Sequence, residues 1–383
     1  MHTQQKKWTL QDGWKHLTNT SNFVSFEEKE NLVFVFGNRF QLADPLRFDE
    51  IRTFYPNSHI IIASTAGEIV EESVIDDSIV ITAVYFEHTD FEVVTAHIEV
   101  GEDSYEVGKK MALSWNHEEL KQVFILSDGQ LVNGSELVKG LNEYLPEKVV
   151  VTGGLAGDGP RFEKTLVGYN AAPNSGNIVG VGFYGDKLTI GYGSIGGWDP
   201  FGPERIITKS KENVLYELDG KSALQLYKRY LGEKAAGLPG TALLYPLSIR
   251  ITNKDKPLVR TILSIDEETQ SMTFAGDVPE GASARLMKAN FDKLIDGAYN
   301  AANASIVSFN DIQPELAILI SCVGRKLLLG PRIDEEVESV AEAIGHTTCI
   351  TGFYSYGEIA PFSGALNCEL HNQTMTITLL SEL

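Results

Sequence analysis

Three stretches of the chain repeat one order of apolar and polar positions, which predicts a β-α-β-loop-β unit written three times. In each stretch, a continuous apolar run indicates a strand covered on both faces, and a helix-like stretch stopped by Pro or Gly follows it. A second apolar strand then leads into a glycine-containing turn, and a third strand closes the unit. The predicted strands are 32–36, 60–63, 78–86, 123–126, 149–151, 178–184, 316–320, 349–350 and 375–380, and the predicted helices are 45–55, 135–145 and 334–344.

Each unit turns at a short segment that ends in Gly followed by an acid, at 64–68, 152–158 and 352–358. The acid follows the end of the first strand by 32, 32 and 38 residues, a regularity typical of an internal repeat. We therefore predict an α/β protein of two related domains, built from these recurring units around buried mixed sheets. The small, turn-rich segment 232–240 predicts the boundary between an N-terminal domain, 1–235, and a C-terminal domain, 236–383.

The segments between the second and third copies have a different pattern. Residues 191–203 contain so many Gly and Pro residues that they favour a loop over a helix or a central strand. The other predicted elements are helices at 222–231 and 289–304, a helix near 107–115, and strands at 241–245 and within 258–274 with a hairpin turn at 266–268.

The net charge of the chain disfavours some classes of binding partner. The chain of 383 residues carries 32 basic and 52 acidic side chains, a formal net charge of −20. This excess repels phosphate backbones and anionic headgroups, so it counts against nucleic-acid and membrane partners. Three cysteines without C-x-x-C spacing, and the lack of a long apolar run, favour a cytoplasmic protein.

Local motifs of catalysis are missing from the sequence. It has no phosphate loop, no G-x-S-x-G elbow, no H-E-x-x-H pair and no paired-cysteine zinc site. Two G-x-G-x-x-G stretches, 180–185 and 191–196, do not open helices, so they indicate glycines of a crowded sheet. We predict no catalytic residue and no metal site.

The glycine-and-acid turns are the candidate ligand site, because open α/β sheets bind ligands just past the carboxyl ends of their strands. Glycine lets a ligand approach the backbone closely. Asp158 and Glu358 either orient the ligand or satisfy amides of their own turns. The predicted ligand-binding residues are Gly153, Gly154, Ala156, Gly157, Asp158, Cys322, Arg325, Tyr354, Tyr356, Gly357, Glu358 and Asn372.

Arg325 and two tyrosines add side-chain chemistry to the third turn. Arg325 either forks onto a ligand carboxylate or forms a salt bridge with Glu358. Tyr354 and Tyr356 alternate along an extended segment, so both are expected on one side, where they suit a small-molecule pocket or a core edge.

At this level of detail the sequence resembles the FIST sensory family over nearly its whole length from Leu32. The strings that carry the resemblance are GFYSYGEIAP at 352–361, LHNQTMTITLL at 370–380, SCVGR at 321–325, Gly330 and GDVPEG at 276–281 for the C-terminal domain, and STAGEI at 64–69 and GGLAGD at 153–158 for the N-terminal domain. The resemblance implies a non-catalytic input domain that binds a small molecule, often proposed to be an amino acid. It also implies a separate output partner, such as a histidine kinase or a cyclic-dinucleotide enzyme.

Two alternatives remain open. Stand-alone members of this size resemble haem-binding nitric oxide sensors that regulate a histidine kinase, and His346 or His371 would then be the axial ligand. Alternatively, either histidine forms a hydrogen bond to the backbone of a turn and binds no haem. The least favoured alternative is an enzyme that uses the turn carboxylates as general bases.

Overall fold

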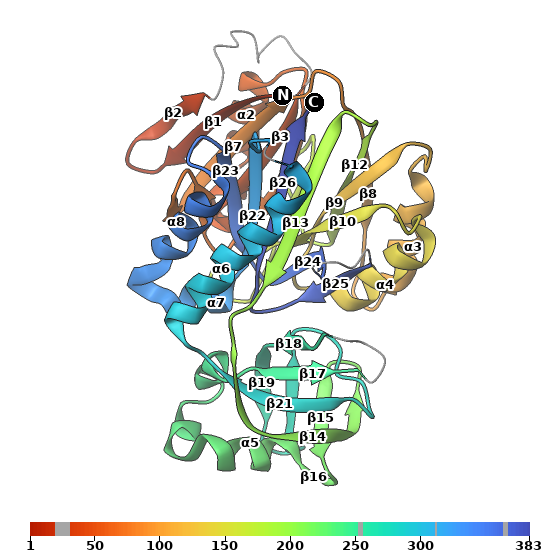
Figure 1. Cartoon of the computed structure of the whole chain (residues 1–383), viewed down its shortest axis with the longest axis vertical. Coiled ribbons are helices and arrows are strands. Elements are labelled where there is room, and N and C mark those ends of the chain that lie inside the picture. The colour runs from red at the N-terminus through yellow and green to blue at the C-terminus, as the bar shows by residue number, and fades with distance from the viewer. Residues whose placement is uncertain (20–30, 252–255, 311, 363–366) are drawn as a thin grey trace.

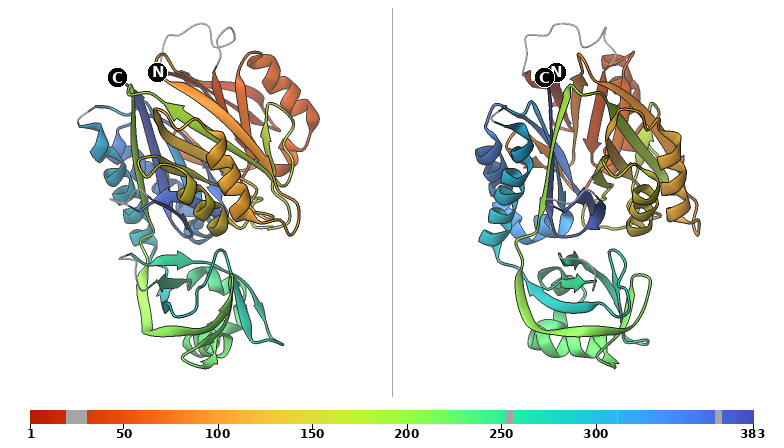
Figure 2. Two further views of the ribbon diagram at one scale, coloured as in Figure 1. Left: turned by 90° about the vertical axis from the view of Figure 1, so that its right-hand side faces the viewer. Right: turned by 45° about the vertical axis from the view of Figure 1, so that its right-hand side comes forward.

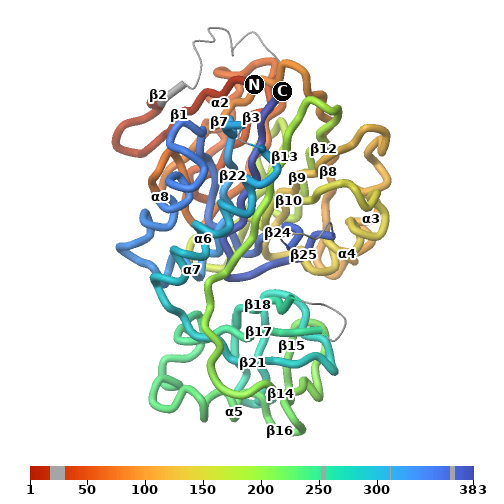
Figure 3. Tube along the Cα trace, viewed as in Figure 1, coloured from red at the N-terminus to blue at the C-terminus, as the bar shows by residue number. Residues whose placement is uncertain are grey.

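Figure 1 shows the computed structural model, which describes residues 1–19, 31–251, 256–310, 312–362 and 367–383. The chain forms two bodies (Figures 1 and 3). The larger one, here called the three-sheet body, comprises the described residues of 1–198 and 289–383, and the inserted body comprises those of 199–288. Both termini lie at the end of the three-sheet body that is remote from the inserted body (Figure 2).

The three predicted copies become three sheets of the same plan. The first sheet runs in the order β11 (Val167–Tyr169), β4 (His59–Ser64), β3 (Leu32–Gly37), β7 (Ser78–Tyr85), β1 (His2–Thr9) and β2 (Gly13–Asn19). The second runs β25 (Cys368–His371), β24 (Gly357–Pro361), β10 (Val150–Leu155), β9 (Leu120–Ser127), β12 (Asn177–Tyr184) and β8 (Asp90–His97). The third runs β13 (Leu188–Ile195), β26 (Met375–Glu382), β22 (Leu316–Cys322), β23 (Cys349–Ser355), β5 (Glu68–Val70) and β6 (Ser73–Ile75).

Within each sheet, the first two strands of the unit are parallel and the third is antiparallel to the first. The parallel pairs are β3 with β4, β9 with β10 and β22 with β23. The antiparallel partners of the first strands are β7, β12 and β26. Strands β3 and β22 are buried at every position, as their continuous apolar runs predict. The α/β fold with buried mixed sheets is therefore confirmed.

The sheets are joined by a cyclic exchange of strands. Strand β5 follows the first turn but pairs with β23 of the third sheet, and β24 follows the third turn but pairs with β10 of the second sheet. Strand β11 follows the second turn and pairs with β4 of the first sheet. Each unit thus gives the strand after its turn to a neighbour, and the three exchanges close a ring.

Helices cover the outer faces of the sheets. Helix α2 packs on the first sheet, α3 and α4 pack together on the second, and α6 and α8 pack together on the third (Figure 1). Side chains cap most of these helices, as when Asn133 Oδ1 accepts from the first turn of α4. The bounds are α1 (Arg39–Leu42), α2 (Pro45–Phe54), α3 (Ser104–Ser114), α4 (Gly134–Tyr144), α6 (Phe291–Ile306), α7 (Val323–Leu329) and α8 (Ile333–Ile344), with 3-10 helices η3 (Val307–Phe309) and η4 (Gly330–Arg332).

The expected loop at 191–203 is wrong for most of its length, because 191–195 belong to strand β13 and 199–203 to strand β14 (Asp199–Lys211), which leaves 196–198 between the two strands. Gly191 and Gly193 lie directly under α6, and a Cβ on either would collide with the backbone oxygen of Ser305 or Ala301. The glycines therefore let a helix lie close to a strand instead of breaking the strand.

The expected turns at 152–158 and 352–358 are also too long. Strand β10 continues through Gly153 to Leu155, and β23 continues to Ser355. Gly153 has a φ of +144°, and a Cβ there would collide with the backbone oxygen of Ile125 on the parallel neighbour. The glycine residues serve contact between strands as well as turning.

The inserted body has its own sheet and core. Its strands run in the order β18 (Leu258–Arg260), β17 (Leu247–Arg250), β21 (Ser283–Lys288), β14 (Asp199–Lys211), β15 (Val214–Leu218), β20 (Ser271–Phe274) and β19 (Ile262–Asp266), with β16 (Lys221–Ser222) beside β15. Helix α5 (Ala223–Leu231) packs on this sheet around buried Tyr227 and Phe274.

The segment near the expected domain boundary lies inside the inserted body. It forms 3-10 helices η1 (Gly232–Gly237) and η2 (Gly240–Leu244), so the expected strand at 241–245 is wrong. The division into 1–235 and 236–383 stays a prediction, and β13 and β26, one from each part, pair in a single sheet. No helix in the described ranges has both the length and the apolar composition needed to cross a bilayer.

Candidate functional site

The three glycine-and-acid turns meet at the end of the three-sheet body that faces the inserted body. We call residues 64–68, 155–158 and 354–358 the turn junction. Backbone hydrogen bonds join its members: Ala66 N donates to Tyr354 O at 2.8 Å, and Gly157 N donates to Ser64 O at 2.8 Å. The turn junction is therefore held together by the chain itself.

Two of the three acids are locked by hydroxyl groups. Glu68 accepts from Thr65 Oγ1 and Ser78 Oγ, each at 2.5 Å. In the same arrangement, Glu358 accepts from Ser355 Oγ at 2.6 Å and from Thr374 Oγ1 at 2.9 Å. Both carboxyl groups are buried.

This burial changes the protonation of the two carboxyl groups. Desolvation raises the pKa of Glu68 and of Glu358 to about 8, although the hydroxyl partners lower it. Both groups are therefore mostly neutral at pH 7, and each is part of a hydrogen-bonded turn.

Asp158 has charged partners instead. It is fully buried, and its Oδ1 accepts from Arg161 Nε at 3.0 Å and lies 3.1 Å from Arg39 Nε. Its Oδ2 accepts from the backbone nitrogen of Lys164 at 3.3 Å. Asp158 thus ties the loop after β10 to helix α1.

The predicted glycines lie where neighbouring residues pack too closely to admit a side chain. A Cβ on Gly154 would lie 2.8 Å from Ile320 Cγ2, and one on Gly157 would lie 2.8 Å from Ala66 N. A Cβ on Gly357 would lie 2.9 Å from Leu370 Cδ1. Ala156 is also buried, and its nitrogen donates to Ser127 O at 2.8 Å.

Arg325 forms a buried ion pair, but its partner is Glu336 and not Glu358. Arg325 Nε donates to Glu336 Oε1 at 2.6 Å, and its Nη2 donates to Leu294 O at 2.7 Å. Glu336 Oε2 also accepts from Tyr354 OH at 2.7 Å and from Ser321 Oγ at 3.0 Å. Burial raises the pKa of Tyr354 well above its usual value. This network ties α7 and α8 to the third sheet.

Tyr354 and Tyr356 belong to the same buried cluster, but their hydroxyl groups have different partners. Tyr354 is fully buried in strand β23, whereas the chain leaves that strand at Ser355 and turns Tyr356 toward the inserted body. Tyr356 OH accepts from Phe162 N at 3.0 Å and donates to Gly159 O at 3.1 Å.

Two further predicted ligand-binding residues, Cys322 and Asn372, are buried. Cys322 is a free cysteine whose thiol pKa is raised by burial, which makes it unreactive. Asn372 is also buried, and its Nδ2 donates to His371 O at 3.0 Å.

Neither histidine considered for haem is placed as a ligand. His371 is buried and its Nε2 lies 2.9 Å from Ala360 O, a backbone partner in strand β24 and not in a turn. His346 is exposed, and its Nδ1 lies 2.6 Å from Glu72 Oε1. Within the described ranges, no group of three or more His, Cys, Asp or Glu side chains could hold a metal ion.

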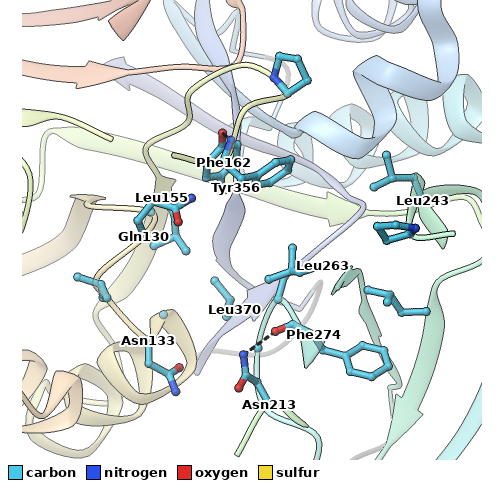
Figure 4. Close-up of a pocket in the computed structure, with 18 of the residues that line it drawn as sticks. Gln130, Asn133, Leu155, Phe162, Asn213, Leu243, Leu263, Phe274, Tyr356 and Leu370 are labelled. Atoms are coloured by element: carbon cyan, nitrogen blue, oxygen red, sulfur yellow. Dashed lines mark hydrogen bonds between the residues drawn. The ribbon is translucent and has the colours of Figure 1, made fainter. Parts of the chain in front are cut away.

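A cavity of about 790 Å³ lies between the turn junction and the inserted body (Figure 4). The three-sheet body contributes the loop between β9 and α4, and the inserted body contributes residues around β19 and β20. The lining residues are 129–134, Leu155, Pro160, Phe162, Leu327, Tyr356 and Leu370 from the three-sheet body, and Asn213, 239–240, Leu243, 262–263 and 274–276 from the inserted body. This volume is within the range of small-molecule sites.

Of the predicted ligand-binding residues, only Tyr356 lines this cavity. The expectation that ligands gather at strand carboxyl ends leads to the correct end of the sheets, since the loop 129–134 follows β9 and Leu155 ends β10. The other lining residues are ordinary apolar and amide side chains that sequence motifs do not mark. An aromatic residue in a Gly-Pro loop, Phe162, was the available signal.

Phe162 presents an aromatic face to the cavity. Its ring stacks on Tyr356 with centroids 4.3 Å apart and an interplanar angle of 16°. The side chain is 37% exposed, and the residue has a φ of +54°, which is unusual for a bulky residue. The Tyr356 hydroxyl, which accepts the Phe162 N–H, helps to hold this conformation.

Comparison with known proteins identifies two domain models in the chain. The FIST N domain matches residues 31–221, and the FIST C domain matches residues 223–361. An uncharacterised protein of Methanocaldococcus jannaschii is 26% identical over 266 residues, covering 61% of this chain and 49% of the relative. The chain thus spans about half the length of that curated relative.

A solved structure also matches, but too weakly to carry an argument. It is the crystal structure of a cyanuric acid hydrolase from A. caulinodans, with a TM-score of 0.18 and 11% identity over 77% of this chain and 99% of that chain.

Proposed function

The chain belongs to the FIST family, whose domains are sensory domains of signal transduction, and from this we propose that it is a small-ligand sensor. We place the ligand in the cavity between the two bodies. The observation that carries this proposal is that residues of both matched domains line the same cavity of about 790 Å³. A ligand there would contact both bodies at once.

Such a ligand would act on the relative position of the two bodies. The bodies are joined by two chain crossings, from β13 to β14 and from β21 to α6. They also contact through buried Arg260, whose Nη1 donates to Leu370 O at 2.7 Å, and through Asn133 Nδ2, which donates to Asp277 Oδ1 at 3.3 Å. A ligand that favours one arrangement shifts the population toward it, and a partner protein can bind the surface that results.

The role is non-catalytic in this proposal. Among the described residues that line the cavity, Tyr356 alone has a titratable side chain, and burial raises its pKa. General acid-base or nucleophilic chemistry needs positioned groups that gain or lose protons near neutral pH. The output would come from a separate cytoplasmic partner, such as a histidine kinase or a cyclic-dinucleotide enzyme.

The haem alternative lacks support from the geometry. The described lining of the cavity has no His, Cys or Met side chain to bind the iron, and the Tyr356 hydroxyl is engaged by two backbone groups. The residues present do not fit a haem in this cavity.

A thermal-shift panel tests the proposal. The panel contains the twenty amino acids and the uncharged compounds indole, benzamide and adenosine. Leu327→Trp fills the cavity from a half-exposed position, and Leu46→Trp places the same ring at an exposed position on α2. We expect a stabilising compound to act on the wild type and on Leu46→Trp but not on Leu327→Trp, and to change the small-angle scattering profile. Equal stabilisation of all three proteins would contradict the proposal.

A further inference from the structure

The chemistry of the cavity lining restricts its ligand. Charged residues make up 22% of the chain, yet none of the described residues that line the cavity is Asp, Glu, Lys, Arg or His. The lining consists of aliphatic and aromatic side chains, three carboxamides and glycine backbone (Figure 4). On the premise of the proposed function, we infer that the cavity binds an uncharged, largely apolar small molecule with a planar ring and one or two neutral hydrogen-bonding groups.

Charged ligands would lose hydration in this cavity without gaining a partner of opposite charge. Transfer of an unpaired carboxylate or ammonium group into an apolar site is strongly unfavourable. A free amino acid carries both groups, so the lining disfavours the amino-acid ligand that the family resemblance suggested. The net charge of −20 adds a repulsive field for any anion.

Phe162 and Tyr356 provide the place for a planar ring. Tyr356 covers one face of the Phe162 ring, and the side chain remains 37% exposed beside the cavity. The positive φ of Phe162 costs conformational free energy, and such outliers are concentrated at ligand-contact sites. An aromatic ligand would extend the stack that these two residues begin.

Two carboxamides provide the place for neutral polar groups. Asn213 Nδ2 donates to Phe274 O at 2.8 Å, so its Oδ1 is left to accept from a ligand (Figure 4). Gln130, which the three-sheet body contributes to the lining, is exposed and offers both a donor and an acceptor. Carboxamides recognise hydroxyl, amide and carbonyl groups without requiring a charge.

A smaller cavity of about 320 Å³ beside the first turn has the opposite character. Its lining includes Glu68, Asp76, Asp77, Arg161 and Lys326. There Lys326 contacts Asp76, and Arg161 contacts Asp158, so the cations are already paired within the protein. A charged molecule would have to compete with these pairs.

Two fluorescent probes with the same ring system test the inference. N-phenyl-1-naphthylamine is uncharged, and 1-anilinonaphthalene-8-sulfonate differs from it by one sulfonate. Fluorescence titration of the full chain would measure both affinities. We expect the neutral probe to bind with one-to-one stoichiometry and at least tenfold more tightly than the sulfonate.

A pair of leucine variants locates the binding. Leu263→Lys introduces a charge from a lining position that is 42% exposed, and Leu10→Lys introduces the same charge at an 82% exposed position between β1 and β2. We expect Leu263→Lys to weaken the neutral probe at least tenfold and to reduce the preference against the sulfonate, whereas Leu10→Lys leaves both affinities unchanged. Circular dichroism confirms that both variants are folded.

The outcomes separate this inference from the proposed function. Equal or tighter binding of the sulfonate, altered by Leu263→Lys, would overturn the neutral-ligand inference and retain the cavity as a ligand site. Absence of binding by the neutral probe would also count against the inference. Probe affinities that are identical in the wild type and Leu263→Lys would overturn both, because the probes would then bind elsewhere.

Discussion

The turn junction and the cavity share Leu155 and Tyr356, but the two regions differ in polarity and in the hydrogen-bonding groups left for a ligand. In the turn junction, Glu68, Asp158 and Glu358 are buried and each accepts hydrogen bonds from nearby residues of the chain. The cavity is apolar, open and bordered by carboxamides with unused hydrogen-bonding groups. Polar groups that already have partners gain little from a ligand, whereas apolar surface in water gains by being covered. The buried acids of the turn junction therefore stabilise the fold, and the apolar cavity beside them is the candidate ligand site.

The largest expected effect comes from breaking the buried ion pair that supports the turn junction. Arg325→Ala leaves Glu336 buried without its cation, and we expect the free energy of unfolding to fall by about 3–5 kcal/mol in urea denaturation. The control is Arg332→Ala, which removes exposed ion pairs with Glu335 and Asp292 and should lower the free energy of unfolding by less than about 1 kcal/mol. Equal effects of the two variants would contradict the assignment of Arg325 to the scaffold.

The next effect is the dependence of the free energy of unfolding on pH, which we attribute to two carboxyl groups of the turn junction. Since burial raises the pKa of Glu68 and Glu358 from 4.5 to about 8, the folded state keeps two protons that the unfolded chain loses above pH 4.5. Their contribution to stability is complete below pH 4.5 and declines as the pH rises to about 8.

Chemical denaturation across this pH range measures that decline. Glu68→Gln and Glu358→Gln should each flatten the pH dependence, because an amide does not titrate. Glu335→Gln, at an exposed position, should leave the slope unchanged. A wild-type slope of the opposite sign, insensitive to both variants, would show that these carboxyl groups are charged in the folded protein.

A smaller effect on stability, with a clear effect on binding, is expected at the edge of the cavity. Phe162→Gly removes the stack on Tyr356 but also relieves the positive φ, so the free energy of unfolding should change by less than about 1 kcal/mol. The affinity for N-phenyl-1-naphthylamine should fall about five- to tenfold. Loss of stability without loss of affinity would instead make Phe162 part of the scaffold.

The smallest effect is expected at His346, which is exposed beside Glu72. His346→Asn should change neither stability nor probe affinity. Titration with haemin should give no stoichiometric Soret band in the wild type or in this variant. A band that disappears in His346→Asn would restore the haem alternative.

The repeating pattern of the sequence predicts much of the architecture. Continuous apolar runs define the buried strands, and the stops at Pro and Gly define the helices, because these signals are local. The errors fall where tertiary packing decides. Gly191 and Gly153 have the appearance of loop residues but allow close contact with α6 and β9.

The sequence predicted the location of the candidate site but not most of the residues that line it. The carboxyl ends of the predicted strands correctly indicate the end of the sheets where the cavity lies. Tyr356 belongs both to the predicted ligand-binding residues and to the cavity lining. Arg325 pairs with Glu336 of another helix, and Glu358 accepts from Thr374, which lies beyond strand β25. The spacing of residues along the sequence does not reveal either partner. Lining residues such as Leu263 have no local signature, because the inserted body brings them to the cavity.

The cyclic exchange of strands has a consequence for synthesis on the ribosome. Strands β24 and β25 complete the second sheet beside β10, and β22, β23 and β26 supply three of the six strands of the third sheet. Within the first 221 residues, β10 and β5 therefore each lack one of their two neighbours, and β13 lacks its neighbour β26. The nascent chain must keep these apolar edges unpaired until the last strands emerge from the exit tunnel. Long-range pairing of this kind slows folding and exposes aggregation-prone edges. A chaperone that shields the nascent chain should therefore raise the yield of native protein more than it would for three independently folding units.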